Sequence, residues 1–347
     1  MKIDFVETEP SDEEYFRAAL PEHELKFNDT LESVEGAAEI LCTYIQSRPD
    51  LAFLDAHPRL KFIAIRASGY DHMDLAECAR RGIAVCNLPS SNANTVAEHT
   101  FALMLALSRR LLEVREANKQ PEFRYEHWRG FDLRDKCLGV VGTGRIGLSV
   151  VRIGLAFGMK VIGCDPYNHS RMAELLGLKY VSLDKLLQES HVISLHTPLT
   201  GETYHLLDRA AFSKCREGVI VINTARGAVI DTDALVEALE SGQVAGAGLD
   251  VLEEEGVMQK EAGKIIADHI VERLHTAPEE EIRMRDPEWL KRIERMFRNQ
   301  RLLSRADVVF TPHVAFNSVE AVEKMREATV ENIRAYLSGE LINLVKD

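Results

Sequence analysis

Leu138-Gly-Val-Val-Gly142-Thr-Gly144-Arg-Ile-Gly147 places a short apolar run directly before three glycines in G-x-G-x-x-G spacing. The apolar run predicts a buried parallel strand. An apolar segment with helical spacing continues to Phe157, and Lys160–Cys164 predicts a second strand that ends on Asp165. Such a strand–turn–helix–strand unit brings backbone amides and a helix N-terminus up to a pyrophosphate group.

The context of the glycines makes the motif informative, because glycine-rich turns are common by themselves. An acid that ends the next strand about 20 residues on completes the dinucleotide fingerprint. We therefore predict that this unit binds a dinucleotide; the alternative is an ordinary tight turn in an α/β sheet. A carboxylate such as Asp165 accepts hydrogen bonds from the adenosine ribose and repels a 2′-phosphate. No arginine follows it directly, although Arg171 is near, so NAD is favoured over NADP.

Composition limits the classes of protein to consider. With 347 residues the chain is long enough for two domains, and 46% hydrophobic and 28% charged residues are typical of a globular protein. A formal net charge of −13 disfavours nucleic acid and membrane surfaces as partners. The N-terminus carries no apolar signal segment, and the six cysteines contain no CxxC pair. We expect a cytoplasmic protein without a structural metal.

Strand-like runs alternate with helical segments along most of the chain, which predicts parallel α/β sheets. We predict an α/β fold of two Rossmann-like domains with doubly wound parallel sheets. Residues 1–96 and 316–347 would form a discontinuous, flavodoxin-like catalytic domain that binds the substrate. Residues 97–315 would form the NAD-binding domain, with a charged helical insertion at about 256–305.

A helix predicted from Val96 to about Val114 is apolar almost all round, and it follows the loop in which the chain crosses between the domains. A helix of this kind should be buried. Burial within the chain and burial in a dimer interface are both consistent with the pattern.

Polar residues follow three predicted strands of the second domain. Arg226 follows the first of these strands, Asp250 with the acidic run Glu253–Glu255 follows the second, and His313 follows the third. Because carboxyl ends of parallel strands share one sheet edge, we expect these groups to converge beside the nicotinamide. Reduction of a carbonyl by hydride needs a fixed cation, an acid and a carboxylate that tunes the acid.

These residues resemble the D-isomer-specific 2-hydroxyacid dehydrogenases, and the resemblance covers nearly the whole chain. It rests on seven ordered motifs, namely the R-x-x-G-x-D loop at Arg66, N-x-P…V-A-E from Asn87 to Glu98, G-T-G-R-I-G at Gly142, H-x-P at His196, N-T-A-R-G at Asn223, G-L-D-V at Gly248 and P-H-x-A at Pro312. The order and number of the motifs make the resemblance more specific than the fingerprint alone.

The resemblance implies a role for each of these positions. Arg226 would grip the carboxylate and carbonyl of the substrate, for which a bidentate guanidinium is suited. His313 would be the acid/base, and Glu255, five residues after Asp250, would pair with it and favour the imidazolium. Asp250 would support this network. Three alternatives stay open: a surface ion pair for Arg226, a structural role for His313, and Glu254 or a solvated acidic face in place of Glu255.

The family reading also implies two binding sets. The substrate would contact Arg226, His313, the backbone amides of Ser68 and Gly69, Ser91 and Phe316. The cofactor would contact Val96, Gly142, Gly144, Arg145, Ile146, Gly147, Asp165, His196, Thr197, Pro198, Thr203, Thr224, Ala225, Arg226, Asp250, His313 and Ala315.

Signals for the substrate conflict. Ser91-Asn92 resembles the phosphoglycerate branch of the family, where lactate-specific members carry a tyrosine, whereas Phe316 and the long insertion resemble the lactate branch. We predict an NAD-dependent, homodimeric dehydrogenase of a small D-2-hydroxyacid, with D-lactate and pyruvate favoured. The alternatives are a phosphoglycerate dehydrogenase, a glyoxylate/hydroxypyruvate reductase, or an NAD(H)-sensing regulator that resembles the corepressors related to this family.

Overall fold

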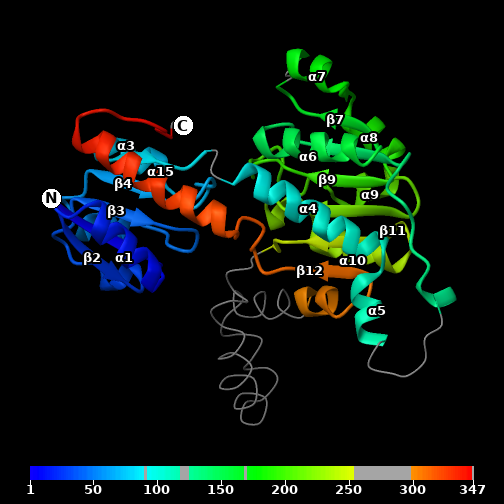
Figure 1. The fold of residues 1–347 in the computed structure, drawn as a ribbon, viewed down its shortest axis with the longest axis horizontal. Helices are drawn as coiled ribbons and strands as arrows, with labels where there is room; N and C mark the ends of the chain where they lie inside the picture. The colour runs from blue at the N-terminus through cyan, green and yellow to red at the C-terminus, as the bar shows by residue number, and fades with distance from the viewer. Residues whose placement is uncertain (90–91, 118–124, 168–169, 254–297, 346–347) are drawn as a thin grey trace, which may run out of the picture. The chain divides into compact units, whose positions relative to one another are not determined.

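The computed structural model describes residues 1–89, 92–117, 125–167, 170–253 and 298–345 (Figure 1). The chain forms two compact units. The first unit contains Met1–Ala93 and Asn317–Asp347, and the second contains Asn94–Phe316. The sequence prediction of parallel α/β sheets is confirmed, since every strand pairing in both sheets is parallel.

The first unit holds a five-stranded sheet of order β2-β1-β3-β4-β5, which is the flavodoxin-like order. Its strands are β1 (Lys2–Val6), β2 (Glu24–Asn28), β3 (Ile40–Thr43), β4 (Phe62–Ile65) and β5 (Ala84–Cys86). Its helices are α1 (Pro10–Ala19), α2 (Leu51–Ala56), α3 (Leu75–Arg80) and α15 (Val319–Leu337). Every residue of β3 and β4 is buried, which explains why these strands are continuous apolar runs in the sequence.

Helix α15 packs against β4 and α1 of the first unit (Figure 1). The Ser318 hydroxyl caps its start by accepting from the Ala321 amide at 3.2 Å. At its far end, the ring of Tyr336 stacks on Phe62 with 4.3 Å between centroids. Gly339 follows with a φ of +86°, a left-handed value that ends a helix without steric cost.

The second unit holds a seven-stranded sheet of order β8-β7-β6-β9-β10-β11-β12. Its strands are β6 (Cys137–Val141), β7 (Lys160–Cys164), β8 (Lys179–Tyr180), β9 (Val192–Leu195), β10 (Val219–Asn223), β11 (Val244–Leu249) and β12 (Val308–Phe310). Its helices are α4 (Ala93–Ser108), α5 (Leu111–Ala117), α6 (Arg145–Ala156), α7 (Ser170–Leu176), α8 (Leu183–Glu189), α9 (Arg209–Lys214) and α10 (Thr232–Glu240). Strand order reverses between β6 and β9, and ligands of open α/β sheets bind beyond the carboxyl ends at such a point.

Three sequence expectations need correction. The strands β2 and β8 were not predicted, because both are short, partly exposed edge strands with no apolar run. The helix predicted from Val96 to Val114 is two helices, α4 and α5. The break lies at Arg109-Arg110, where Arg110 has a φ of +53° that a helix cannot continue through.

Helix α4 is buried within the second unit by Phe101, Leu103 and Met104, which join the core on one face of the sheet. Beyond the break, Leu111 and Leu112 of α5 are 52% and 41% exposed. None of the helices in the described ranges is long and apolar enough to cross a membrane.

Candidate active site

The three fingerprint glycines lie in three different environments. Gly142 has a φ of +85°, and a Cβ there would lie 2.6 Å from the His196 carbonyl oxygen. A Cβ on Gly147 would lie 2.0 Å from the Gly142 carbonyl oxygen. By contrast, a Cβ on Gly144 would meet no protein atom within 4 Å. The outer glycines therefore let the backbone pack, and the middle one leaves open space for a ligand.

Helix α6 starts at this open space. Gly144 is its N-cap residue and offers no side chain to cap the first-turn amides. Arg145, the first helical residue, is exposed, and Ile146 is half-buried. Uncapped amides and the positive end of the helix dipole together suit a phosphate group.

Asp165 lies at the end of β7, beside the glycine turn. Its carboxylate accepts from the amide and hydroxyl of Thr143 at 2.6 and 3.0 Å. Its second oxygen accepts from the Tyr167 amide at 2.8 Å. Thr143 is thereby tied to Asp165, which orients the carboxylate at the half-exposed edge of the sheet.

His196 and Thr197 follow β9, directly across the switch point from Gly142. The His196 Nε2 lies 2.7 Å from the Ser194 hydroxyl, whereas its Nδ1 and the Thr197 hydroxyl are shielded from solvent and have no hydrogen-bond partner among the described residues. Burial lowers the pKa of His196 to about 3, so its ring is neutral. Buried polar atoms without partners are rare, and their place beside the open glycine turn fits a bound dinucleotide.

The loop after His196 is held by its own polar groups. The Thr203 hydroxyl donates to the Pro198 carbonyl at 2.6 Å and accepts from the Thr200 amide at 2.8 Å. These bonds give Pro198 and Thr203 a fixed position at the end of β9.

The Arg226 loop follows β10. The Asn223 side chain donates to the Arg226 carbonyl at 2.9 Å and accepts from the buried Ala225 amide at 3.0 Å, which closes the turn. A Cβ on Gly227 would lie 2.0 Å from the Leu252 backbone, so only glycine lets this loop pack against the segment after β11. The half-buried Arg226 donates from Nη1 to the Ala225 carbonyl at 2.8 Å.

The His313 turn is organised around Asp250, whose side chain is 1% exposed. The Asp250 carboxylate accepts from the Thr311 hydroxyl at 2.6 Å, from the Val314 amide at 3.0 Å and from the Ala315 amide at 2.9 Å. The His313 amide donates to the Asp250 carbonyl at 2.7 Å. These bonds hold His313 at a φ of +54°, which a non-glycine residue adopts only when its surroundings impose it.

Two further pairs complete this edge of the sheet. The ring of Phe316 lies edge-on to His313, with 6.3 Å between centroids. The Thr224 hydroxyl lies 3.0 Å from Thr100 of α4, whose own hydroxyl donates to the Val96 carbonyl at 2.8 Å. Val96 is itself buried.

Comparison with known proteins now identifies the family. Residues 101–315 match the family model "D-isomer specific 2-hydroxyacid dehydrogenase, NAD binding domain". The D-lactate dehydrogenase of Escherichia coli (strain K12) is 33% identical over 352 residues, covering 98% of each chain. The chain belongs to the D-isomer-specific 2-hydroxyacid dehydrogenases. It is an NAD-dependent oxidoreductase that acts on CH–OH donors, as the sequence predicted.

Other members of the family also match over most of the chain. A glyoxylate reductase of Thermococcus litoralis is 34% identical over 310 residues, covering 87% of this chain and 82% of that protein. The crystal structure of D-lactate dehydrogenase from Aquifex aeolicus, complexed with NAD and lactic acid, superposes with a TM-score of 0.83. That structure is 34% identical and covers 97% of this chain and 96% of its own. The D-lactate dehydrogenase of Escherichia coli and the glyoxylate reductase are thus about equally similar in sequence to this dehydrogenase.

Two sequence-predicted substrate positions lie in the first unit of the dehydrogenase. The Ser68 hydroxyl donates to the Leu88 carbonyl at 2.7 Å and lies 3.1 Å from the Asn92 side-chain oxygen. Gly69 is the next residue in the same loop after β4. The buried Arg66 holds that loop by donating to the Val6 and Glu7 carbonyls at 2.8 and 2.6 Å. Ser91, and Glu255 of the acid/base pair, lie outside the described residues.

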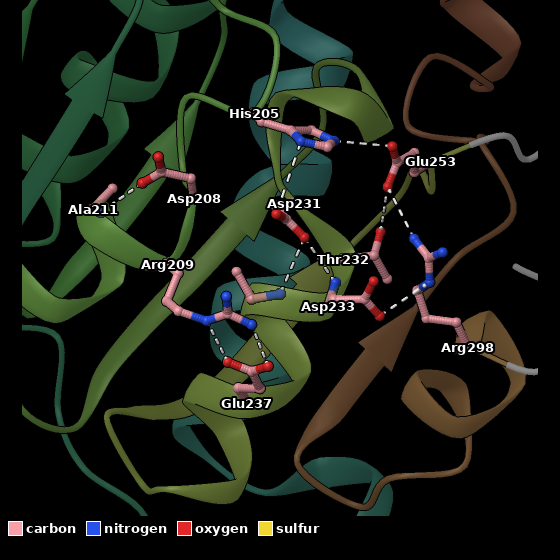
Figure 2. Close-up of polar contacts among 11 residues, drawn as sticks. His205, Asp208, Arg209, Ala211, Asp231, Thr232, Asp233, Glu237, Glu253 and Arg298 are labelled. Carbon is pink, nitrogen blue, oxygen red and sulfur yellow. Dashed lines mark hydrogen bonds and ion pairs between the residues drawn. The ribbon is translucent and has the colours of Figure 1, made fainter.

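A polar cluster that the sequence did not indicate surrounds Glu253 (Figure 2). The Glu253 carboxylate lies 2.9 Å from Nε2 of His205, accepts from the Thr232 hydroxyl at 3.0 Å and lies 3.7 Å from Nη1 of Arg298. His205 stacks on Tyr204 and has a φ of +50°. This cluster anchors the chain three residues after Asp250, on the segment that leads towards Glu255.

The predicted site residues lie in motifs, whereas several residues that support them were not predicted. Thr143 lies within the glycine motif and Thr311 follows β12, but His99 and the His205–Glu253 pair carry no local pattern. Their partners are distant along the chain, for example 212 residues for His99 and Thr311. A hydroxyl residue directly after an apolar strand, as at Thr311 after β12, was an available signal.

Proposed function

We propose that this dehydrogenase interconverts D-lactate and pyruvate with NAD. The observation that carries the proposal is the His313 turn, in which an aromatic ring, Phe316, lies beside the histidine. An aromatic residue there narrows the space for the substrate side chain and favours a methyl group over a phosphorylated chain. The similarity to D-lactate dehydrogenases over nearly full length supports the same choice.

In this proposal Arg226 binds the substrate. Its guanidinium pairs with the carboxylate and polarises the 2-keto oxygen. The bond from its Nη1 to the Ala225 carbonyl, within the turn that Asn223 closes, orients it. Backbone amides of Ser68 and Gly69 bind the carboxylate from the loop after β4, and Ser91 lines the substrate side chain.

His313 is proposed as the proton donor for the keto oxygen in reduction and the acceptor in oxidation. Glu255 is proposed as the carboxylate that pairs with the ring. Asp250 acts through the backbone of the turn and keeps the ring in place. The Gly142–Gly147 turn, Asp165 and the loop at His196 would hold NADH, which would supply the hydride.

A panel of keto acids tests the proposal. Oxidation of NADH is followed with pyruvate, glyoxylate, hydroxypyruvate and phosphohydroxypyruvate, and we expect the highest kcat/KM with pyruvate. A preference for phosphohydroxypyruvate would assign a phosphoglycerate dehydrogenase, and a preference for glyoxylate or hydroxypyruvate a reductase of those acids. His313→Ala should lower kcat by about 10²-fold or more; an unchanged rate would remove His313 from the mechanism.

A regulator that senses NAD(H) is the second candidate, because corepressors that resemble this family keep its catalytic residues. In that case purified protein would turn over every keto acid negligibly and would capture a peptide partner only when NADH is present. Measurable kcat with any acid of the panel argues against it.

We further propose a homodimer formed through the α4–α5 region. A cavity of about 480 Å³ opens there, lined by Ala106, Leu112, Phe131 and Val309 among others. The exposed Leu112 borders the cavity, its neighbour Leu111 is also exposed, and exposed apolar side chains of this size favour an interface. Leu112→Glu should give a monomer in light scattering, whereas Leu175→Glu, on the exposed face of α7, should not. A monomeric wild type would reject the proposal.

Domain roles and location follow as proposals from the same family reading. Residues 1–96 with 316–347 would bind substrate, residues 97–315 would bind NAD, and the 256–305 insertion would belong to the second domain. A cytoplasmic location is supported by six cysteines that are all unpaired and mostly buried. Fractionation of cells that express the tagged protein tests it.

A further inference from the structure

His99 of α4 reaches the base of the His313 turn. Its Nε2 lies 2.8 Å from the Thr311 hydroxyl and 3.5 Å from Oδ1 of Asp250. Its side chain is 22% exposed, so the contact lies at the border of the interior. None of the motifs in the sequence assigns a role to this histidine.

The direction of each hydrogen bond from His99 through Thr311 to Asp250 can be assigned. An ionised carboxylate only accepts, so the Thr311 hydroxyl spends its one hydrogen on Asp250 at 2.6 Å. The Thr311 oxygen must then accept from His99, which places a hydrogen on Nε2 of His99. The order is therefore His99 N–H to Thr311 O–H to the Asp250 carboxylate.

Charge supports the same reading. Asp250 is almost fully buried, and a buried carboxylate is costly unless it is paired or fully hydrogen-bonded. Among the described residues, its hydrogen-bond donors are the neutral Thr311 hydroxyl and the amides of Val314 and Ala315. Within the described part of the chain, His99 is the one basic side chain within 4.0 Å of its oxygens.

Among the described residues, the His99 ring contacts Asp250, which follows β11, and Thr311, which follows β12. Thr311 does not titrate and precedes His313 by two residues. On α4 itself, Glu98 accepts from the Asn94 side chain one turn earlier. The described contacts of His99 thus lead through Thr311 and Asp250 to the turn that holds His313.

We infer that His99 is a positioning residue for His313. Its N–H orients the Thr311 hydroxyl towards Asp250, and Asp250 holds His313 at its left-handed φ. The inference rests on the proposed role of His313 as the acid/base. Without this donor, only the Asp250 carboxylate orients the Thr311 hydroxyl, so the bond between Thr311 and Asp250 that supports the turn is weakened.

Two variants of His99 separate the donor from the ring. His99→Leu removes the donor, and His99→Gln keeps an N–H at a similar reach. His191→Gln is the matched control, because His191 is in the same unit at the opposite, amino end of β9, where it accepts from the Cys137 amide. Thr311→Val removes the next group in the series, the hydroxyl that donates to Asp250. For each variant, kcat and KM are measured across pH with the best keto acid, together with the NADH dissociation constant and the melting temperature.

We expect His99→Leu and Thr311→Val each to lower kcat about tenfold, which corresponds to ~1.4 kcal/mol. The pH profile should change while the NADH dissociation constant stays that of the control. In the double variant kcat should also fall about tenfold rather than a hundredfold, because both changes interrupt the same series of hydrogen bonds from His99 to Asp250. His99→Gln should recover kcat to within about threefold of wild type.

Three results would overturn the inference: wild-type kcat and pH profile in His99→Leu, no recovery in His99→Gln, or additive losses in the double variant. Should His99→Leu fail to fold, His99→Gln and Thr311→Val decide. If the wild type reduces no keto acid, the proposed function fails by itself. The His313 ring is then followed by NMR titration, where a midpoint moved by about half a pH unit in Thr311→Val supports the coupling and an unmoved midpoint refutes it.

Discussion

Alanine substitutions at two glycines of the turn should have different effects. Gly147→Ala should destabilise the fold, and Gly144→Ala should weaken binding of the cofactor. At Gly144 the φ of −64° and ψ of −164° are open to alanine, and a Cβ there would meet no protein atom within 4 Å. Gly144→Ala should therefore fold with a melting temperature close to that of wild type. The methyl group would occupy the space through which a pyrophosphate approaches the first-turn amides of α6.

The magnitude follows from the bonds at risk. Loss of one charge-assisted hydrogen bond costs about 1.5–3 kcal/mol, which raises the NADH dissociation constant about 10- to 150-fold. At Gly147 the Cβ would lie 2.0 Å from the Gly142 carbonyl oxygen, so backbone must move. We expect Gly147→Ala to destabilise the fold by about 3 kcal/mol, the upper part of the range for overpacking.

The assay is NADH fluorescence titration beside thermal and urea unfolding for both variants. Unchanged NADH affinity in Gly144→Ala would show that the pyrophosphate does not lie on this turn, and the reasoning would be wrong. Wild-type stability in Gly147→Ala would contradict the close packing of α6 on β6. Lower stability in Gly144→Ala together with weaker NADH binding in Gly147→Ala would show that the two glycines have the opposite roles.

Three more predictions concern single carboxylates and one histidine. Asp165→Ser should raise KM for NADH about tenfold and lower the preference for NADH over NADPH; an unchanged ratio of kcat/KM for the two cofactors would contradict this. Burial lowers the pKa of His196 to about 3. Below about pH 6.5 the unfolded chain therefore takes up a proton that the folded chain does not. The free energy of unfolding should fall as the pH falls from about 6.5 towards 3. Urea unfolding should show that wild type loses about 2 kcal/mol more than His196→Gln between pH 7.5 and 5, and equal losses would show that the ring takes up its proton in the folded state. Glu253→Gln should lower kcat severalfold, because it loosens the segment that leads to Glu255, and should leave NADH affinity unchanged. Its control is Glu237→Gln, in the exposed pair with Arg209 (Figure 2), which should have no effect on kcat.

The supports of the site show why motifs alone were not enough. Gly142, Gly144 and Gly147 act within one turn, so their spacing along the chain carries their function. Asp250 was indicated by its motif, but its task of accepting two amides and a hydroxyl from the His313 turn joins residues 61–65 positions apart. His205 and Glu253 meet across 48 positions, and neither has a spacing that could reveal the other.

The edges of the sheets were missed for a related reason. Central strands such as β3 and β10 are buried along their whole length and therefore appear as apolar runs. The edge strand β8 has two residues, Lys179 and Tyr180, and takes its strand geometry from pairing with β7. The break after α4 likewise depends on the left-handed backbone of Arg110, which no residue preference indicates.

The order of strands, helices and glycines along the chain was enough to predict the two parallel α/β sheets and the NAD cofactor. The contact of Asp165 with the cofactor ribose stays a prediction. These features depend on contacts between near neighbours and on the period of apolar residues, which a sequence displays directly. Only the folded chain decided that Gly144 faces open space, that His196 keeps a neutral ring with an unpartnered nitrogen, and that His99 reaches Asp250 through Thr311. Each of these depends on strands brought side by side by burial of their apolar faces, and that burial sets distances between residues far apart in the chain.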